Sequence, residues 1–215
     1  DTIKQQWETK DTVLVHGVTS SGKTEIYLHL IEEAIARGEQ VLYLLPEIAL
    51  TTQIIQRLRK HLGDRVGIYH SRYSGNERVE VWNQVLNFSA ADGRKPRGQV
   101  ILGARSALFL PYSKLGLVIV DEEHDSSYKQ QDPAPRYHAR DTALYLASLF
   151  NAKTILGSAT PSIESYYHAT SGKYGLVTLQ TRFGNVAMPA VQLVNMNTVR
   201  SQSKHFRWSV LFWRN

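Results

Sequence analysis

Short apolar runs alternate with helical segments along the first 156 residues. Apolar runs of strand length, without alternating polar positions, occur at residues 12–15, 41–45, 65–69, 99–102, 117–120 and 154–156. Such runs are typical of strands that are covered on both faces. Between them, apolar positions recur at helical spacing over residues 22–37, 50–62, 75–87 and 138–150. Because parallel neighbours need crossover connections, this pattern predicts an α/β fold: a mostly parallel sheet with helices on both faces.

Three segments depart from this pattern. Residues 88–98, with two Gly, one Pro, two Arg and one Lys, predict an exposed basic loop. Residues 125–137 are polar with two Pro and two Tyr, and a long excursion of this kind is often functional. Residues 191–194 predict a last strand, whereas 196–215 show no period. We therefore expect a domain over 1–195 and a tail over 196–215, either a truncated linker or a disordered end.

Composition excludes several classes of protein. Residues of the AVILMFWYC set make up 42% and charged residues 20%, which fits a globular chain and not a disordered or fibrous one. There is no cysteine, so no disulfide framework and no thiolate zinc site can form within these residues. No apolar run is long enough for a membrane span, and residues 1–10 are too polar for a signal peptide, so we expect a cytoplasmic protein.

The net charge gives only weak information about a partner. It is 25 − 19 = +6, but residues 190–215 contain four basic residues and no acid, which leaves 21 − 19 = +2 for residues 1–189. Charge alone therefore does not predict a nucleic-acid partner.

A phosphate-binding motif follows the first predicted strand. The segment Gly17-Val-Thr-Ser-Ser-Gly-Lys-Thr24 fits G-x-x-x-x-G-K-[ST], and it lies between a strand and a helix, as that motif requires. Its glycines allow backbone N–H groups to surround phosphate oxygens at a helix N-terminus. The alternative is a glycine-rich turn that matches by chance. The predicted nucleotide-binding residues are Gly17, Thr19, Ser20, Ser21, Gly22, Lys23 and Thr24.

An acidic cluster follows a later buried strand. Asp121, Glu122, Glu123 and His124 come directly after residues 117–120, at the sheet edge where open α/β folds bind ligands. Asp121 can hold Mg²⁺ with Thr24, and Glu122 can activate the attacking water. A solvated acidic turn is the alternative, but the phosphate motif 98 residues upstream, counted from Lys23 to Asp121, favours a catalytic site.

These motifs, followed by Gly157-Ser-Ala-Thr-Pro161, resemble motifs I, II and III of superfamily two helicases, in that order. Further segments, at residues 16–27, 46–51, 103–109, 121–131 and 136–141, resemble the PriA family of bacterial replication restart helicases. The family pattern has a second glycine where this chain has Ser20, a small-for-small change that keeps phosphate binding plausible. The resembling segments cover most of residues 13–165.

The resemblance implies a DNA-dependent ATPase that unwinds branched DNA with 3′ to 5′ polarity and helps to reload the replicative helicase. Its fold would be a RecA-like lobe, and its cofactors ATP and Mg²⁺. Expected partners are single-stranded and forked DNA, other primosome proteins and single-stranded-DNA-binding protein, with no membrane. The chain is similar to the first helicase lobe only, so the family's zinc module would lie outside these residues.

The resemblance also implies roles for individual residues. Lys23 would bind the triphosphate, Asp121 the Mg²⁺, and Glu122 would be the catalytic base. His124, Ser158 and Thr160 would couple the nucleotide state to DNA. The implied DNA-binding residues are Thr51, Thr52, Arg105, Ser106, Tyr128, Lys129, Arg136 and Tyr137.

Each implied DNA contact has a structural alternative. Thr51 and Thr52 can simply cap a helix, and Arg105 can be an ordinary exposed arginine. Tyr128 and Tyr137 can stack on bases, or they can pack on their own domain. Two other classes of function also remain. A nucleotide-dependent assembly or transport ATPase would not respond to DNA, and a DNA-binding module with a vestigial nucleotide site would bind DNA independently of ATP.

Overall fold

The computed structural model describes residues 2–49, 52–70, 73–89 and 97–182, and these belong to one compact unit, Asp1–Asn185. Its centre is a seven-stranded sheet in the order β3-β4-β2-β5-β6-β1-β7, in which every pairing is parallel. The strands are β1 (Thr12–Gly17), β2 (Gln40–Leu44), β3 (Val66–Tyr69), β4 (Val100–Gly103), β5 (Leu115–Asp121), β6 (Lys153–Ser158) and β7 (Gly175–Leu179).

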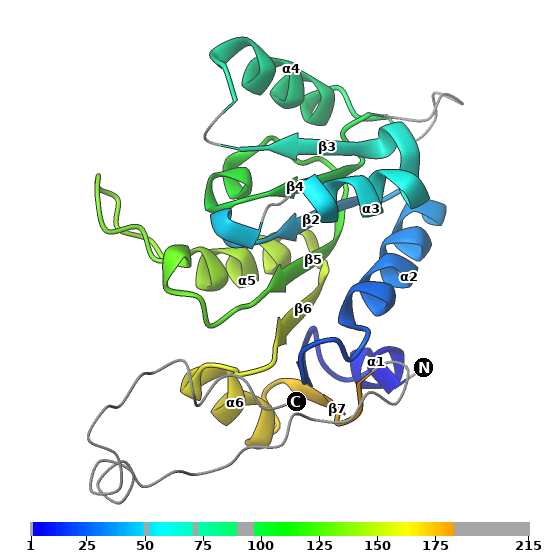
Figure 1. The fold of residues 1–215 in the computed structure, drawn as a ribbon, viewed down its shortest axis with the longest axis vertical. Helices are drawn as coiled ribbons and strands as arrows, with labels where there is room; N and C mark the ends of the chain where they lie inside the picture. Colours follow the sequence, from blue (N-terminus) through cyan, green and yellow to red (C-terminus); the bar gives the residue numbers. More distant parts are fainter. Residues whose placement is uncertain (1, 50–51, 71–72, 90–96, 183–215) are drawn as a thin grey trace, which may run out of the picture. The chain divides into compact units, whose positions relative to one another are not determined.

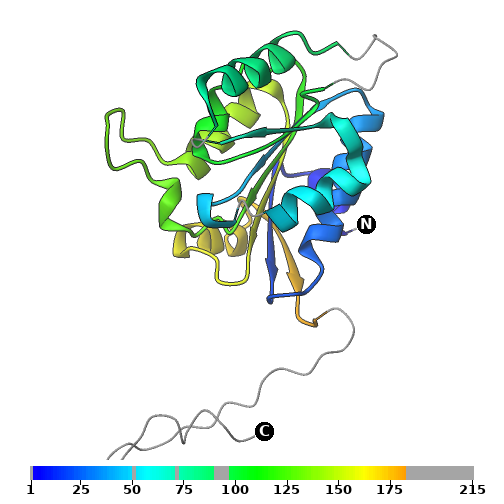
Figure 2. The same ribbon diagram turned by 45° about the horizontal axis from the view of Figure 1, so that its top comes forward.

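Helices cover both faces of this sheet, as Figures 1 and 2 show. Apolar residues of α1 (Thr2–Trp7), α2 (Lys23–Ala36) and α3 (Thr52–Leu62) join the core cluster on one face. Those of α4 (Gly75–Leu86), α5 (Ala139–Phe150) and α6 (Ile163–Thr170) join the cluster on the other face. Short 3-10 helices complete the connections: η1 (Glu47–Ala49), η2 (Gly63–Arg65), η3 (Arg105–Phe109) and η4 (Ser126–Tyr128).

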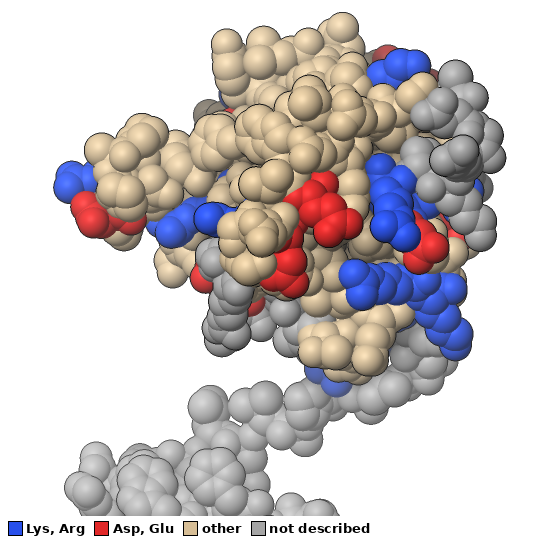
Figure 3. All heavy atoms as spheres, turned by 90° about the horizontal axis from the view of Figure 1, so that it is seen from above, with Lys and Arg blue, Asp and Glu red and all other residues tan. Residues whose placement is uncertain are grey.

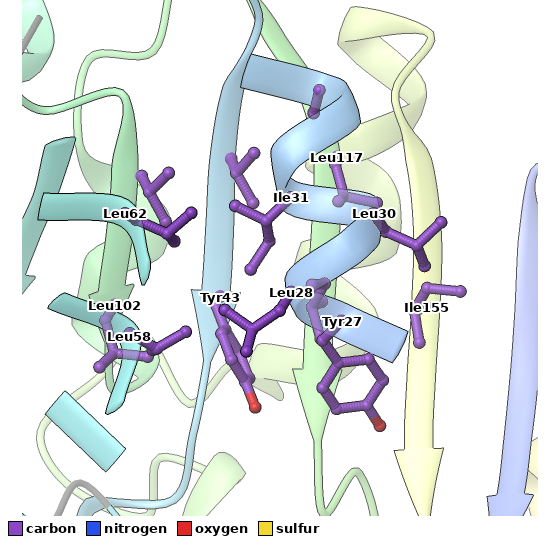
Figure 4. Close-up of a cluster of buried hydrophobic side chains, with 14 of the residues drawn as sticks. Tyr27, Leu28, Leu30, Ile31, Tyr43, Leu58, Leu62, Leu102, Leu117 and Ile155 are labelled. Carbon is purple, nitrogen blue, oxygen red and sulfur yellow. The ribbon is translucent and has the colours of Figure 1, made fainter. Parts of the chain in front are cut away.

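The strands are apolar on both sides because both sides are covered. Along β1, Val13 and Val15 belong to the cluster shown in Figure 4, whereas Leu14, which points to the opposite face, belongs to the other cluster. All three are fully buried. The predicted α/β class, a parallel sheet between two layers of helices, is therefore confirmed.

The strand order determines which loops meet. β6 lies between β5 and β1, with Asp121 opposite Gly157 and Ser158 opposite His16 in the parallel register. Because the carboxyl ends of parallel strands reach the same edge, the connections after β1, β5 and β6 are neighbours there. The phosphate motif, the acidic cluster and the segment beginning at Gly157 are thus brought to one place.

Three predicted helices, at residues 22–37, 75–87 and 138–150, occur with ends within one residue of the prediction. The fourth, predicted over 50–62, is observed from Thr52, and residues 50–51 lie outside the described residues. The pattern missed α1, α6 and β7. The predicted strand at 191–194, the boundary at 195 and the tail at 196–215 all lie outside the described residues.

Candidate nucleotide-binding site

The phosphate motif forms a tight loop between β1 and α2. Two residues have left-handed backbone conformations, Ser20 with φ 64° and Gly22 with φ 88°. At Gly17 a Cβ atom would lie 2.6 Å from Ser21 Oγ and 3.1 Å from Leu179 Cβ, so a larger residue would require these side chains to move. Lys23 Nζ donates a hydrogen bond to the Gly17 carbonyl oxygen over 2.8 Å, which holds the ammonium group across the loop. The loop therefore has the turned backbone and the cation that phosphate binding requires.

An open depression of about 680 Å³ lies over this loop. Its size falls within the range of ligand pockets. Its lining contains most of the residues expected at the nucleotide, namely Thr19, Ser20, Ser21, Gly22, Lys23, Thr24, Asp121 and Glu122. Three lining residues were not expected: Glu25, His29 and Arg57. Glu25 and His29 share a face of α2 at a spacing of four residues, so the sequence could have indicated them. Arg57 could be found only from the fold, because its ion pair with Glu25 joins α3 to α2.

Asp121 is the last residue of β5, and hydrogen bonds reach both of its carboxylate oxygens. The Tyr27 hydroxyl donates to Oδ1 over 3.3 Å and the Tyr43 hydroxyl donates to Oδ2 over 3.2 Å. The backbone N–H of Glu122 also donates to Oδ1, over 3.1 Å, and the Tyr128 hydroxyl donates to the Asp121 carbonyl oxygen over 2.7 Å. The side chain and main chain of Asp121 are thus oriented by groups from α2, β2 and η4.

Burial of this carboxyl changes its acidity. Burial raises the pKa of Asp121 from its ordinary 3.8 to about 6, and the negative charge of Glu122 acts in the same direction. Lys23 and the hydrogen bonds from Tyr43 and the Glu122 amide oppose the rise. Burial also raises the pKa of the Tyr27 and Tyr43 hydroxyls well above their ordinary value, so both remain hydrogen-bond donors.

The groups around the pocket fit Mg²⁺ in complex with a phosphate. Mg²⁺ prefers oxygen ligands, and usually takes one or two from protein and the rest from water and phosphates. The Asp121 carboxylate and Thr24, whose side chain carries a hydroxyl, line the same depression. Within the described ranges, no cluster of three His, Cys, Asp or Glu residues could hold a metal by itself. Asp121 and Thr24 could each supply one oxygen ligand to a Mg²⁺ that takes its other ligands from phosphates and water.

Glu122, the expected catalytic base, has a strained backbone. Its φ is 48°, in the left-handed region that a glutamate rarely adopts. Strain of this kind costs on the order of 1 to 3 kcal/mol and persists where the surrounding structure imposes it, often at functional sites. The Glu122 side chain lines the depression beside Asp121.

His124, the last residue of the acidic cluster, contacts the segment after β6. Its Nδ1 is 2.8 Å from Ser158 Oγ, and its Nε2 is 3.4 Å from Thr160 Oγ1. Glu122 Oε2 is 3.7 Å from the same Nδ1. The structure thus brings together the three residues expected to couple nucleotide and DNA, and places them next to the expected base.

Sequence reasoning missed the role of Glu123, whose side chain is fully buried. Its carboxylate accepts hydrogen bonds from the Ser162 backbone N–H over 2.7 Å and from the Ser165 hydroxyl over 2.8 Å. Arg140 NH1 donates to it over 3.1 Å and also to Ser162 Oγ over 2.7 Å. Because Ser162 caps α6 and Arg140 lies in α5, Glu123 ties the acidic cluster to two helices.

The expected DNA-binding residues differ in exposure and in the contacts that they make. Thr52 begins α3 and is exposed, Thr51 lies outside the described residues, and Ser106 is partly buried in η3. Arg105 NH1 donates to the backbone carbonyl oxygens of Ser127 over 3.1 Å and Lys129 over 3.4 Å. Arg105 is therefore not simply an exposed arginine, because it holds the polar loop that follows β5.

The two tyrosines of that loop, which were expected to stack on bases, lie in different surroundings. Tyr128 is only 1% exposed, and its hydroxyl is bonded to the Asp121 carbonyl oxygen. The prediction that its ring stacks on bases is wrong for this structure, because the ring belongs to the core cluster formed with α5. Tyr137 packs edge-on against Phe109, with ring centroids 5.1 Å apart, and Phe109 is 55% exposed.

The rest of the loop is held by its own backbone. Lys129 Nζ donates to the Arg136 carbonyl oxygen over 2.6 Å, and Lys129 and His138 form an antiparallel bridge. Arg136 is exposed.

On the face shown in Figure 3, the described basic and acidic side chains are interspersed, without one dominant basic patch. No helix among the described residues is both long and apolar enough to cross a bilayer.

Comparison with known protein families identifies the family of this chain. The family model described as DEAD/DEAH box helicase matches residues 1–168, more than three quarters of the chain. The chain belongs to the DEAD/DEAH box helicase family. Use of ATP and Mg²⁺ is implied by this membership, and the pocket described above is the candidate nucleotide site.

Curated relatives of this DEAD/DEAH lobe carry the name replication restart protein PriA. The Chlamydia pneumoniae protein is 45% identical over 193 residues, which are 90% of this chain and 25% of that protein. The Bacillus subtilis protein is 43% identical over 183 residues, 85% of this chain and 22% of that protein. The chain thus spans about a quarter of the length of these relatives.

Solved helicase structures share the fold at low identity. RecG bound to a three-way DNA junction matches 90% of this chain and 24% of the RecG chain, with a TM-score of 0.56 and 19% identity. The Pyrococcus furiosus Hef helicase domain matches 85% of this chain and 38% of that chain, with a TM-score of 0.53 and 16% identity. These similarities support the predicted RecA-like lobe.

Proposed function

We propose that this chain is the ATP-binding first lobe of a 3′ to 5′ DNA helicase that acts in the restart of stalled replication forks. The observation that carries the proposal is the meeting of three motifs at one sheet edge: Lys23 and Asp121 line one pocket, and His124 connects that pocket to Ser158 and Thr160. The identity of 43 to 45% with replication restart proteins supports the choice among helicases.

Each group at the pocket has a role in this proposal. Lys23 and the backbone N–H groups of the loop bind the β and γ phosphates. Thr24 and Asp121 would hold Mg²⁺, which would supply positive charge to the phosphate oxygens. Glu122 orients the attacking water and accepts its proton. Its strained backbone supports this role, because φ 48° is maintained beside the pocket.

The proposed coupling runs from Glu122 through His124 to the segment after β6. A change in the nucleotide alters the surroundings of Glu122, and His124 contacts Ser158 and Thr160 directly. On the DNA side, we propose Thr51, Thr52, Arg105, Ser106, Lys129, Arg136 and Tyr137 as contacts. Tyr128 is omitted because its ring is buried.

The proposed partners are single-stranded and forked DNA, with other primosome proteins and single-stranded-DNA-binding protein. The described residues form one lobe. An arginine supplied by another domain can be worth about 10³ to 10⁵ in rate in phosphoryl transfer. We therefore propose that the isolated chain binds Mg²⁺-ATP weakly and hydrolyses it slowly.

The test is calorimetric titration of the folded chain with a slowly hydrolysed ATP analogue and Mg²⁺. Lys23→Ala should abolish binding because it removes the ammonium group that is proposed to bind the phosphates. Lys114→Ala, an exposed lysine just before β5 at the opposite edge of the sheet, is the matched control and should bind normally. Absence of binding by folded wild-type protein would refute the proposed nucleotide site.

A second measurement separates the helicase lobe from the two other classes. Affinity for forked DNA is measured at several salt concentrations, with and without the analogue. A helicase lobe should show DNA affinity that changes with nucleotide. No DNA binding favours an assembly or transport ATPase, and binding unaffected by nucleotide favours a DNA module with a vestigial site.

A further inference from the structure

Two buried tyrosines donate hydrogen bonds to the Asp121 carboxylate. Tyr27 on α2 and Tyr43 on β2 are both 0% exposed, and their rings meet edge to face with centroids 5.7 Å apart. Figure 4 shows both hydroxyl oxygens pointing toward the end of the sheet where the arrowheads of β5 and β6 lie. Each hydroxyl donates to a different oxygen of the Asp121 carboxylate, over 3.3 and 3.2 Å.

The neighbouring strand leaves space for one of these hydroxyls. Gly157 on β6 is paired with Asp121 in the sheet, and a Cβ atom at this position would lie 1.8 Å from the Tyr27 hydroxyl oxygen. The same Cβ would be 3.0 Å from Asp121 Oδ1. Glycine is therefore required here for the Tyr27 hydroxyl to reach the carboxylate.

We infer that Tyr27 and Tyr43 are positioning residues that orient the Asp121 carboxylate toward the Mg²⁺ of the bound nucleotide. This inference rests on the proposed function, since it concerns the same pocket. It adds two residues that the sequence analysis did not assign to the site, and both would act on the metal only through Asp121.

The geometry explains how the orientation is achieved. A carboxylate turns about its Cβ–Cγ bond unless its oxygens are held, and each oxygen can accept more than one hydrogen bond. One tyrosine hydroxyl on each oxygen, both from rigid buried rings, fixes the plane of the group, and the Glu122 N–H adds a second donor to Oδ1. The remaining acceptor position, on Oδ2, is then available to a ligand in the pocket that Lys23 and Thr24 also line.

Another buried tyrosine of the same lobe offers a matched control. Tyr112 is 8% exposed, and its hydroxyl donates to the Ala107 carbonyl oxygen over 3.0 Å. It belongs to the core cluster on the other face of the sheet. Tyr112→Phe therefore removes a buried tyrosine hydroxyl and one hydrogen bond without altering the surroundings of Asp121.

The experiment measures analogue binding to the 215-residue chain by calorimetry, once with Mg²⁺ and once with EDTA. Loss of groups that orient a metal ligand typically weakens metal affinity by about 10- to 100-fold. We expect the Tyr27→Phe/Tyr43→Phe double variant to lose Mg²⁺-dependent affinity by about that factor, with its affinity in EDTA unchanged. Tyr112→Phe should match the wild type in both solutions. If the double variant is not folded in a thermal melt, Tyr27→Phe alone is used, and a smaller Mg²⁺-specific loss is expected.

The outcomes separate this inference from the proposed function. Wild-type protein without Mg²⁺-dependent binding overturns both. Wild-type binding that Lys23→Ala abolishes, combined with normal Mg²⁺ dependence in the tyrosine variants, overturns the inference alone. Equal losses with Mg²⁺ and with EDTA also overturn it, because they indicate a general structural defect. A loss confined to the Mg²⁺ solution supports it.

Discussion

Asp121→Asn should stabilise the nucleotide-free protein while removing a group that the proposed function needs. The substitution keeps the shape of the side chain and replaces the charged carboxylate with a neutral amide. Its Oδ1 can still accept from the Tyr27 hydroxyl and the Glu122 N–H, as the carboxylate does. Its NH₂ group can donate to the Tyr43 hydroxyl oxygen, which can also accept a hydrogen bond.

The magnitude follows from the pKa of the carboxyl. The rise from 3.8 to about 6 means that the fold favours the protonated form over the charged one. At about 1.36 kcal/mol per pKa unit, the charged form costs the folded state about 3 kcal/mol at pH 7. Asp121 also lines an open pocket, where water reduces that cost. We therefore expect a gain of about 1 to 3 kcal/mol in the free energy of unfolding.

The dependence on pH identifies the cause. Because the folded pKa is raised, the folded protein holds this proton more tightly than the unfolded chain between about pH 4 and 6. Wild-type stability therefore falls as the pH rises through that range, whereas the amide of the Asp121→Asn variant has no proton to lose. The advantage of Asp121→Asn should be full at pH 7 and should disappear near pH 4.

Urea unfolding of both proteins at a series of pH values, without nucleotide, measures this difference. Asp64→Asn, at an exposed aspartate in η2, is the matched control for replacing a carboxylate with an amide. A difference between Asp121→Asn and wild type that stays constant from pH 4 to 7 would refute the reasoning, because the charge would then not be its source.

Three further predictions concern the same edge of the sheet. Glu123→Ala removes the acceptor of the Ser162 N–H and the Ser165 hydroxyl, whereas Arg140 keeps its ion pair with Asp141. Unpaired buried donors should lower the free energy of unfolding by about 1 to 3 kcal/mol in urea titration. Gly157→Ala should cost about 1 to 3 kcal/mol through the clash with the Tyr27 hydroxyl, and adding Tyr27→Phe should recover part of that loss in thermal melts. Ser20→Gly relieves a left-handed backbone and should raise stability by up to about 1 kcal/mol, whereas a clear loss would show that φ 64° carries no strain.

The two tyrosines of the loop after β5 show what the sequence alone could not predict. Tyr128 and Tyr137 lie in one polar loop, and local sequence treats them alike as rings available for stacking. In the fold, Tyr128 is 1% exposed and bonded to Asp121, whereas Tyr137 packs against Phe109 near the surface. Exposure depends on what covers a side chain, and Tyr128 belongs to a core cluster with residues of β2, β4 and α5, which the local sequence of the loop does not contain.

The sequence by itself determined the α/β class, the positions of most helices and strands, and the phosphate and acidic motifs. These features depend on local periodicity and on short motifs, so the residues that carry them are close together in the chain. Only the tertiary structure decided which groups orient Asp121 and what Glu123 binds. Tyr27 and Tyr43 lie 94 and 78 residues from Asp121, and Ser162 and Ser165 lie 39 and 42 residues from Glu123. These contacts exist because the strand order places β5 between β2 and β6, and neither periodicity nor a motif encodes that order.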